Sequence, residues 1–156
     1  MKLAGIVCLD SVVAELEAED RDGVILELIS ALGRAGELGR AKPDKIAEAV
    51  ILRENEASTG LGKGVAVPHV KTLAVKEVVA TVGCSGNGID FSSLDKQPVY
   101  SVILLLSPTG SADRHLQAME CVFRNLQKED FRRFLRQAQT VEQIKETILE
   151  ADMSEN

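Results

Sequence analysis

The sequence predicts one α/β domain in which a small mixed sheet of about five strands is flanked by helices. Three observations support this fold class. The chain has 156 residues, a length that suits one domain with its own core. Apolar residues make up 45% of it and charged residues 27%, the balance of a soluble globular protein. Aliphatic, strand-like segments alternate with segments whose apolar residues recur at helical spacing.

The first third of the chain predicts a strand followed by two helices. Residues 12–16 are apolar in loose alternation, which predicts a strand. Asp20 is placed to cap a helix that runs to about residue 32, where glycines break it. Pro43 opens a second helix that ends near residues 54–56, because the first turn does not need the N–H that proline lacks. The buried faces are expected to be Val24, Ile25, Leu28, Ile29 and Leu32 in the first helix and Ile46, Ala47, Val50 and Ile51 in the second.

The middle of the chain alternates turn signals with strand-like segments. Glycine and small polar residues mark the turns, and runs of valine, isoleucine and leucine mark the strands. The expected order is a loop over 58–64, a short strand over 65–67 that Pro68 stops, a strand over 78–84, a turn over 86–88, a short strand over 89–91 and a strand over 99–106.

The last third predicts helices. Apolar residues recur at helical spacing over 119–126 and again over 131–135. Thr140 and Gln143 form a capping box for a last helix. The expected division of the chain is an N-terminal segment of unknown role over 1–10, the domain over 11–150 and a C-terminal tail over 151–156.

Composition and charge exclude several classes of function. Lys and Arg number 18 against 24 Asp and Glu, a net charge of −6, which argues against binding nucleic acid or an anionic membrane. No apolar run approaches the roughly 20 residues of a membrane span, so membrane insertion is not expected. Asp10 interrupts the apolar N-terminus, which disfavours a signal peptide. Three cysteines without a C-x-x-C pair indicate a reducing, cytoplasmic setting in which they pack as small hydrophobic residues: Cys8, Cys84 and Cys121.

A glycine-rich loop and two histidines are candidate functional residues. Gly60, Gly62 and Gly64 come after a helix and before a strand, the reverse of the order in nucleotide-binding motifs. They form either a flexible turn or a loop whose N–H groups line an anion site. His69 lies at the end of a short strand and His115 at the start of a helix. Taken alone, each histidine also fits a surface or capping position.

Other residues bear on phosphate, metal and hydrolase chemistry. Arg53 lies at a helix end beside the loop, where a guanidinium can hold a phosphate with two hydrogen bonds, although the helix dipole also accounts for an arginine there. The cysteines lack ligand spacing around the histidines, so no metal is expected. A hydrolase with Ser58, Thr59 or Ser107 as nucleophile is disfavoured, because no G-x-S-x-G elbow is present.

The segment from Arg53 to His69, RENEASTGLGKGVAVPH, resembles the signature of type-2 IIA domains of the phosphotransferase system, the fructose, mannitol and nitrogen-regulatory class. In that signature an R-E pair is followed by S-T-G, alternating glycines, small aliphatic residues and P-H. The resemblance extends over residues 12–149, including I-D-F at 89–91 and H-L at 115–116.

The resemblance implies roles for individual residues. His69 would be the phosphorylated residue, and His115 would assist the phosphoryl group. Val70 is larger than the residue often found after this histidine, a departure at the edge of the site. Neither a metal nor an organic cofactor is implied. The phosphate-binding residues would be Arg53 and, in the loop, Ser58, Thr59 and Gly60.

The implied function is that of a phosphoryl carrier whose donor is an HPr-like protein. Its acceptor would be a IIB domain at a fructose- or mannitol-type sugar permease, or the carrier would signal to a regulated target protein through its phosphorylation state. The sequence contains no IIB, IIC or DNA-binding segment, which favours the nitrogen-regulatory role. A phosphate-independent binding module with the same fold is the alternative from another class. Its mark would be the loss of His69 or Arg53, and both are present.

Overall fold

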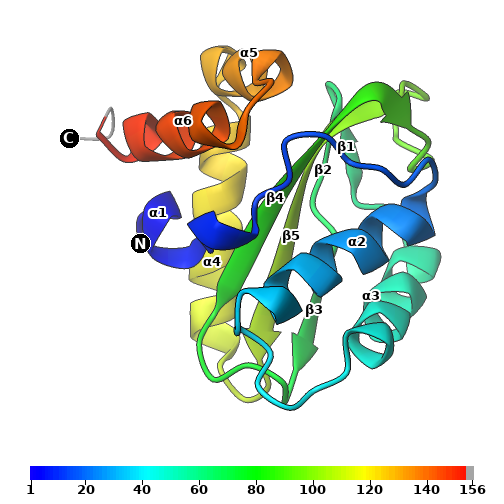
Figure 1. Cartoon of the computed structure of the whole chain (residues 1–156), viewed down its shortest axis with the longest axis vertical. Helices are drawn as coiled ribbons and strands as arrows, with labels where there is room; N and C mark the ends of the chain where they lie inside the picture. The colour runs from blue at the N-terminus through cyan, green and yellow to red at the C-terminus, as the bar shows by residue number, and fades with distance from the viewer. Residues whose placement is uncertain (154–156) are drawn as a thin grey trace.

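A five-stranded mixed sheet between two layers of helices forms the protein (Figure 1). The structure, a computed structural model, describes residues 1–153. It confirms the predicted fold class. In chain order the elements are α1 (Leu3–Ile6), a 3₁₀ turn (Leu9–Ser11), α2 (Arg21–Arg34), α3 (Pro43–Glu56), β1 (Gly60–Gly62), β2 (Val65–Ala66), β3 (His69–Thr72), β4 (Val79–Ile89), β5 (Val99–Pro108), α4 (Ala112–Leu126), α5 (Glu129–Gln137) and α6 (Val141–Met153).

Strand β5 organises the sheet. It pairs antiparallel with β4 on one side and parallel with β2 and β3 on the other, and β1 folds back antiparallel on β2. Val65 pairs with Ser101 and His69 with Leu105, so β2 and β3 keep the same register along β5. They are one strand that is interrupted where Pro68, which has no N–H, cannot donate to the ladder.

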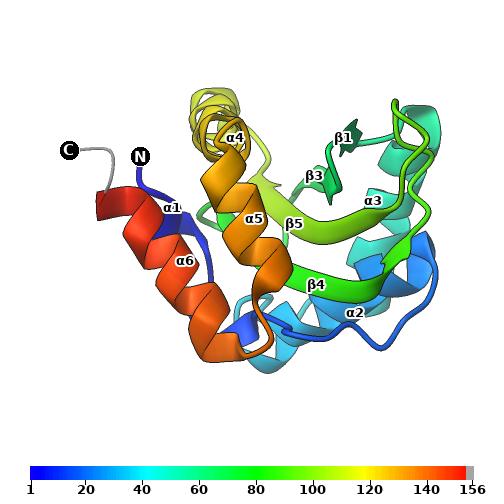
Figure 2. The ribbon, with the colours of Figure 1, turned by 90° about the horizontal axis from the view of Figure 1, so that it is seen from above.

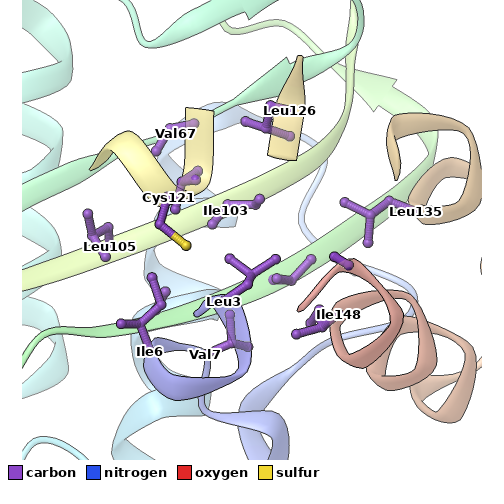
Figure 3. Close-up of a cluster of buried hydrophobic side chains, with 14 of the residues drawn as sticks. Leu3, Ile6, Val7, Val67, Ile103, Leu105, Cys121, Leu126, Leu135 and Ile148 are labelled. Atoms are coloured by element: carbon purple, nitrogen blue, oxygen red, sulfur yellow. The ribbon is translucent and has the colours of Figure 1, made fainter. Parts of the chain in front are cut away.

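Alternate residues of β5 face two separate cores. Ile103 and Leu105 belong to a cluster with α1, α4, α5 and α6, whereas Leu104 and Leu106 belong to a cluster with α2 and α3. Figure 2 shows these two groups of helices on opposite sides of β4 and β5. In Figure 3, side chains from α1, α4, α5 and α6 meet those of the strands in the first cluster. Burial on both faces explains why the strand reads as one apolar run.

Helices α2 and α3 form as the sequence predicts. At the start of α2 the Asp20 carboxylate accepts a hydrogen bond from the Gly23 N–H at 2.7 Å. Pro43 occupies the first turn of α3. Gly33 does not break α2, which continues to Arg34. A Cβ at Gly33 would come within 3.2 Å of the Pro43 ring, so this glycine allows the two helices to approach.

The prediction of a loop over 58–64 is wrong, because most of these residues belong to a β-hairpin. Strand β1 covers Gly60–Gly62, and the chain then turns into β2 through Lys63 and Gly64, whose φ angles are 58° and 78°. The glycines therefore supply the left-handed backbone of a tight turn rather than a flexible loop.

The strand predicted over 12–16 does not form. Val13 makes a single bridge to Gly83 of β4. The segment crosses the edge of the sheet, with Val12 in the core beside α4 and Leu16 in the core beside α2. The N–H groups of Val13 and Leu16 donate to main-chain carbonyls of β4, so the segment lies along the edge of that strand without forming a regular ladder.

Strand β4 is longer than the sequence predicts. The turn expected over 86–88 and the separate strand expected over 89–91 do not occur, because β4 continues to Ile89. An irregularity in its pairing with β5 between Cys84 and Ile89 takes up the glycine-rich residues.

Two of the three cysteines are buried, as expected for small hydrophobic residues. Cys84 and Cys121 lie in the core beside α4, and Cys8 is half-buried. Burial raises the pKa of the Cys84 thiol to about 11, so this thiol stays protonated at neutral pH.

The first residues of the chain are fixed to α6. Leu3 is fully buried, and the buried Asp152 carboxylate accepts hydrogen bonds from the Leu3 N–H at 2.6 Å and the Ala4 N–H at 2.7 Å. Residues 1–10, predicted only as a segment of unknown role, therefore contribute to the core. Of the tail predicted over 151–156, residues 151–153 belong to α6 and residues 154–156 lie outside the described residues.

Asp152→Ala is expected to lower the free energy of unfolding by about 2 kcal/mol, because the buried Leu3 N–H and the partly buried Ala4 N–H lose a charged acceptor. Denaturant titration measures this loss. Glu150→Ala, an exposed change in the same helix, is the matched control. Equal stability of the two variants would show that the carboxylate does not hold α1.

Candidate functional site

His69 stands at the interruption between β2 and β3. The sequence placed it at the end of a strand, but it is the first residue of β3, because pairing with β5 resumes directly after Pro68. The Val67 N–H bonds to the Thr59 carbonyl at 3.2 Å, on the side away from β5. The Val67 carbonyl is then the partner of His69 Nδ1, at 2.8 Å.

This bond decides which nitrogen of His69 is free. A carbonyl oxygen only accepts, so Nδ1 of His69 carries the proton and donates it to Val67. In the neutral ring the other nitrogen, Nε2, then holds an unshared electron pair. Nε2 is therefore the ring nitrogen of His69 that is able to act as a nucleophile.

His115 lies beside His69. It occupies the first turn of α4, and its ring centroid is 5.6 Å from that of His69, with the ring planes inclined by 41°. Its Nδ1 lies 2.6 Å from the Oγ of Ser107, near the end of β5. The structure thus brings together the two histidines that the sequence singled out.

The pKa values of both histidines are lowered. For His69 the main cause is desolvation by burial, and the positive charge of Arg53 lowers the pKa further. The hydrogen bond to the Val67 carbonyl and the negative charge of Glu54 act in the opposite direction and raise it. For His115 the main cause is again desolvation, followed by the charges of His69 and Lys71. Both imidazoles are therefore neutral at pH 7.

If His69 accepts a phosphoryl group, as the resemblance implies, the pH dependence of that acceptance follows from these directions. Protonation of Nε2 removes the electron pair of His69, and a lowered pKa moves that loss below the usual value of 6.5. We expect a constant rate near neutrality that falls on the acidic side of 6.5. Arg53→Gln removes a positive charge and is expected to raise the pKa of His69. NMR titration measures both pKa values, and a wild-type His69 that titrates above 6.5 would contradict this account.

Arg53 and Glu54, in the last turn of α3, have different surroundings. Arg53 Nη1 donates to the Ala57 carbonyl at 3.1 Å, and the other N–H groups of the guanidinium can donate to an anion. Glu54 is only 3% exposed. Its Oε2 accepts from the Thr59 N–H at 2.6 Å and its Oε1 accepts from Thr59 Oγ1 at 2.7 Å. A buried carboxylate is thereby satisfied by two donors.

The loop residues predicted to bind phosphate make hydrogen bonds within the protein. The Ser58 hydroxyl donates to the Phe91 carbonyl and accepts from the Gly60 N–H at 3.0 Å. Thr59 gives its two donors to the buried carboxylate just described. A Cβ at Gly60 would lie 2.3 Å from Ser93 Oγ, so this close approach requires glycine. Phosphate binding by these three residues stays a prediction, and the two hydroxyl groups would have to turn toward the phosphate.

Sequence reasoning did not assign three supporting groups of the site: the Val67 carbonyl, the Glu54 carboxylate and the Ser107 hydroxyl as a partner of His115. Ser107 left a signal, because it is a polar residue at the end of an apolar strand and must find a partner when buried. The role of a main-chain carbonyl leaves no trace in the identity of Val67.

Neither a membrane-spanning helix nor a metal cluster occurs in the part of the chain that the structure describes. Within residues 1–153 no helix combines the length and apolar character that crossing a bilayer requires. Nor do three His, Cys, Asp or Glu side chains gather into a metal site within those residues.

Comparison with known proteins identifies relatives of this chain. Residues 6–151 match the family described as the phosphoenolpyruvate-dependent sugar phosphotransferase system, EIIA 2. The fructose-specific EIIABC component of Bacillus subtilis is 32% identical over 97% of this chain, which spans only 24% of that protein. The fructose-specific EIIA component of Haloferax volcanii is 30% identical, with 95% of each chain covered. The nitrogen regulatory protein of Klebsiella oxytoca is 36% identical over 81% of this chain and 77% of its own length.

Solved structures show the same fold. The nitrogen regulatory protein IIA-Ntr from Neisseria meningitidis has a TM-score of 0.83 at 23% identity, covering 94% of this chain and 98% of that one. The mannitol IIA of Escherichia coli has a TM-score of 0.73 at 20% identity, covering 89% and 96%. The resemblance drawn from residues 53–69 is confirmed by a match over nearly the whole chain. The chain belongs to the type-2 EIIA family of the phosphoenolpyruvate-dependent phosphotransferase system, as a phosphotransferase component with a phosphohistidine intermediate.

Proposed function

We propose that His69 is the residue that carries the phosphoryl group and that a phosphohistidine on an HPr-like protein donates it. The supporting observation is the bond from Nδ1 to the Val67 carbonyl at 2.8 Å, which leaves Nε2 with its electron pair. His69 is only half-buried, so a donor protein can reach it. Its lowered pKa keeps the ring neutral at pH 7.

Transfer to His69 forms one bond and breaks one. The Nε2 electron pair attacks phosphorus while the N–P bond of the donor breaks, and the pair of that bond returns to the donor imidazole. The proton stays on Nδ1, hydrogen-bonded to the Val67 carbonyl. The phosphorylated ring is therefore positively charged beside the anionic phosphoryl group. In the next transfer this ring departs as a neutral imidazole, which keeps the phosphoryl group reactive.

Two groups are placed to stabilise the charge of the phosphoryl oxygens. Arg53 supplies a fixed positive charge whose field already acts on His69. His115, with its ring centroid 5.6 Å from that of His69, supplies a ring N–H. Phosphoryl transfer through a loose transition state requires positioning and charge stabilisation more than covalent assistance, and these groups provide both.

Exposed leucines flank the site residues along the chain and suit the docking of a protein donor and acceptor. Leu116 follows His115 and is 58% exposed, and Leu52 precedes Arg53 and is 66% exposed. Large apolar side chains that gather on a surface mark protein-interaction sites. Leu61, which follows Gly60, and Leu94, whose N–H bonds to the Gly60 carbonyl, are also exposed.

We favour a regulatory role, in which the phosphorylation state of His69 controls a target protein in the cytoplasm. The nitrogen regulatory relative of Klebsiella oxytoca, at 36% identity, supports this choice. The alternative is transfer to a IIB domain of a sugar permease, which the fructose-specific relatives at 32% and 30% identity support. Another member of the fold was solved as the mannitol IIA with phosphorylated IIB from Escherichia coli. A permease gene beside this one would favour transport.

Intact-mass spectrometry at neutral to alkaline pH tests the proposal. The chain is incubated with phosphoenolpyruvate, enzyme I and HPr, and a second sample omits HPr. One acid-labile phosphoryl group, gained only with HPr present and mapped to His69, is the expected result. No gain with several HPr homologues would contradict the proposal and favour a phosphate-independent binding module.

A further inference from the structure

Ser107, near the end of β5, is a buried polar residue to which the proposed phosphoryl transfer has so far given no role. Its side chain is fully buried, and alternation along β5 directs it to the same face as Ile103 and Leu105, toward α4. Among the described residues, the partner of its hydroxyl is His115 Nδ1, at 2.6 Å. The strand thus ends by presenting a single polar side chain to the auxiliary histidine.

Burial determines the direction of this hydrogen bond. If Nδ1 of His115 carried the proton, Ser107 Oγ would accept it and the buried hydroxyl hydrogen would have no acceptor. If Ser107 donates to an unprotonated Nδ1, both groups are satisfied. The second arrangement avoids an unpaired buried donor, so the neutral His115 ring has its proton on Nε2.

We propose that Ser107 is a positioning residue for phosphoryl transfer, which fixes neutral His115 with its proton on Nε2 as a donor to the phosphoryl oxygens. This inference rests on the proposed role of His69. The two adjacent rings then hold opposite states at Nε2: His69 has an electron pair that attacks phosphorus, and His115 has an N–H that stabilises the oxygens. A carbonyl fixes the first ring and a hydroxyl fixes the second.

The opposite states are what the reaction requires. If His115 had its proton on Nδ1, its Nε2 would present an electron pair to the anionic phosphoryl oxygens and would repel them. A histidine without a fixed partner divides its proton between both nitrogens, so only part of the population would be competent. Ser107 removes that division without touching the phosphoryl group itself.

Nitrogen-15 NMR of the imidazole rings tests the assignment directly. The chain has two histidines, so a long-range ¹H–¹⁵N spectrum at neutral pH shows two rings, and His115→Ala assigns them. The wild type is expected to show His115 protonated at Nε2. Ser107→Ala is expected to show a mixture of both tautomers, and Ser107→Thr, which keeps the hydroxyl, is expected to restore the wild-type pattern. A wild-type ring protonated at Nδ1, or a Ser107→Ala ring like that of the wild type, would overturn the proposal.

The transfer rate is the second measurement. Ser107→Ala is expected to slow onward transfer from phosphorylated His69 to an acceptor protein by about tenfold, the effect of one lost hydrogen bond to a group that contacts the transferred charge. Ser101→Ala, a buried serine on the same strand that faces Cys84, is the matched control and is expected to keep the wild-type rate. Wild-type speed in Ser107→Ala, with folding confirmed by thermal unfolding, would overturn the proposal. Absence of phosphorylation in the wild type would instead refute the role of His69, while the NMR result would still decide the tautomer.

Discussion

His69→Ala is expected to abolish phosphorylation by phospho-HPr, whereas His115→Ala is expected to accept the phosphoryl group and pass it on about 100-fold more slowly. The difference follows from the atoms involved. In the proposed mechanism Nε2 of His69 forms the bond to phosphorus, so removal of this side chain leaves no acceptor. In the same mechanism His115, with its ring centroid 5.6 Å from that of His69, acts on the phosphoryl oxygens and does not form the bond.

Single-turnover mixing with phospho-HPr, followed by addition of an acceptor protein, separates the two steps. Circular dichroism checks the fold of each variant, because His69 gives up one hydrogen bond to Val67 when it is replaced. Gln117→Ala, an exposed change two residues after His115 in the same helix, is the matched control. Equal loss of phosphoryl acceptance in the two histidine variants would refute this division of roles.

The sequence predicted well those elements whose signals are local. The Asp20 cap and Pro43 fix where α2 and α3 begin, because each acts on the backbone groups within its own first turn. The apolar run over residues 102–106 of β5 was also predicted correctly, since burial on both faces favours apolar residues between Ser101 and Ser107. Such signals need no knowledge of the rest of the chain.

Elements that depend on distant partners were predicted less well. The hairpin of β1 and β2 exists because β2 pairs with β5, and no local pattern indicates that pairing. His69 begins a strand for the same reason: residues on both sides of Pro68 keep one register along β5. Glycine content alone could not distinguish this hairpin from a flexible loop.

The candidate site shows the same division. The resemblance over residues 53–69 identified His69 and Arg53 as site residues. Without that resemblance, the position of His115 in the sequence gives no reason to place it next to them. What orients the site is a set of bonds between segments: Thr59 to Glu54, His69 to Val67 and His115 to Ser107. Two of these use main-chain groups, which have the same chemistry whatever residue stands there.

Glu54→Ala is expected to lower the free energy of unfolding by about 3 kcal/mol, because two donors of Thr59 lose a charged acceptor and one of them is a buried N–H. It is also expected to slow phosphoryl acceptance by about 100-fold through misplacement of His69. The connection is continuous: Glu54 fixes the Thr59 N–H, the Thr59 carbonyl accepts from the Val67 N–H, and the Val67 carbonyl holds Nδ1 of His69.

Glu54→Gln separates this connection from the effect of charge. The glutamine amide can accept from the Thr59 N–H with its oxygen and donate to Thr59 Oγ1 with its nitrogen, so the loop keeps its place. The negative charge of Glu54 raises the pKa of His69, so its removal is expected to lower that pKa further and leave the rate near pH 7 unchanged. Glu56→Ala, an exposed change in the same turn, is the matched control. If Glu54→Gln were as slow as Glu54→Ala, Glu54 would act through its charge, and the hydrogen-bonded connection to His69 would not be the reason for its burial.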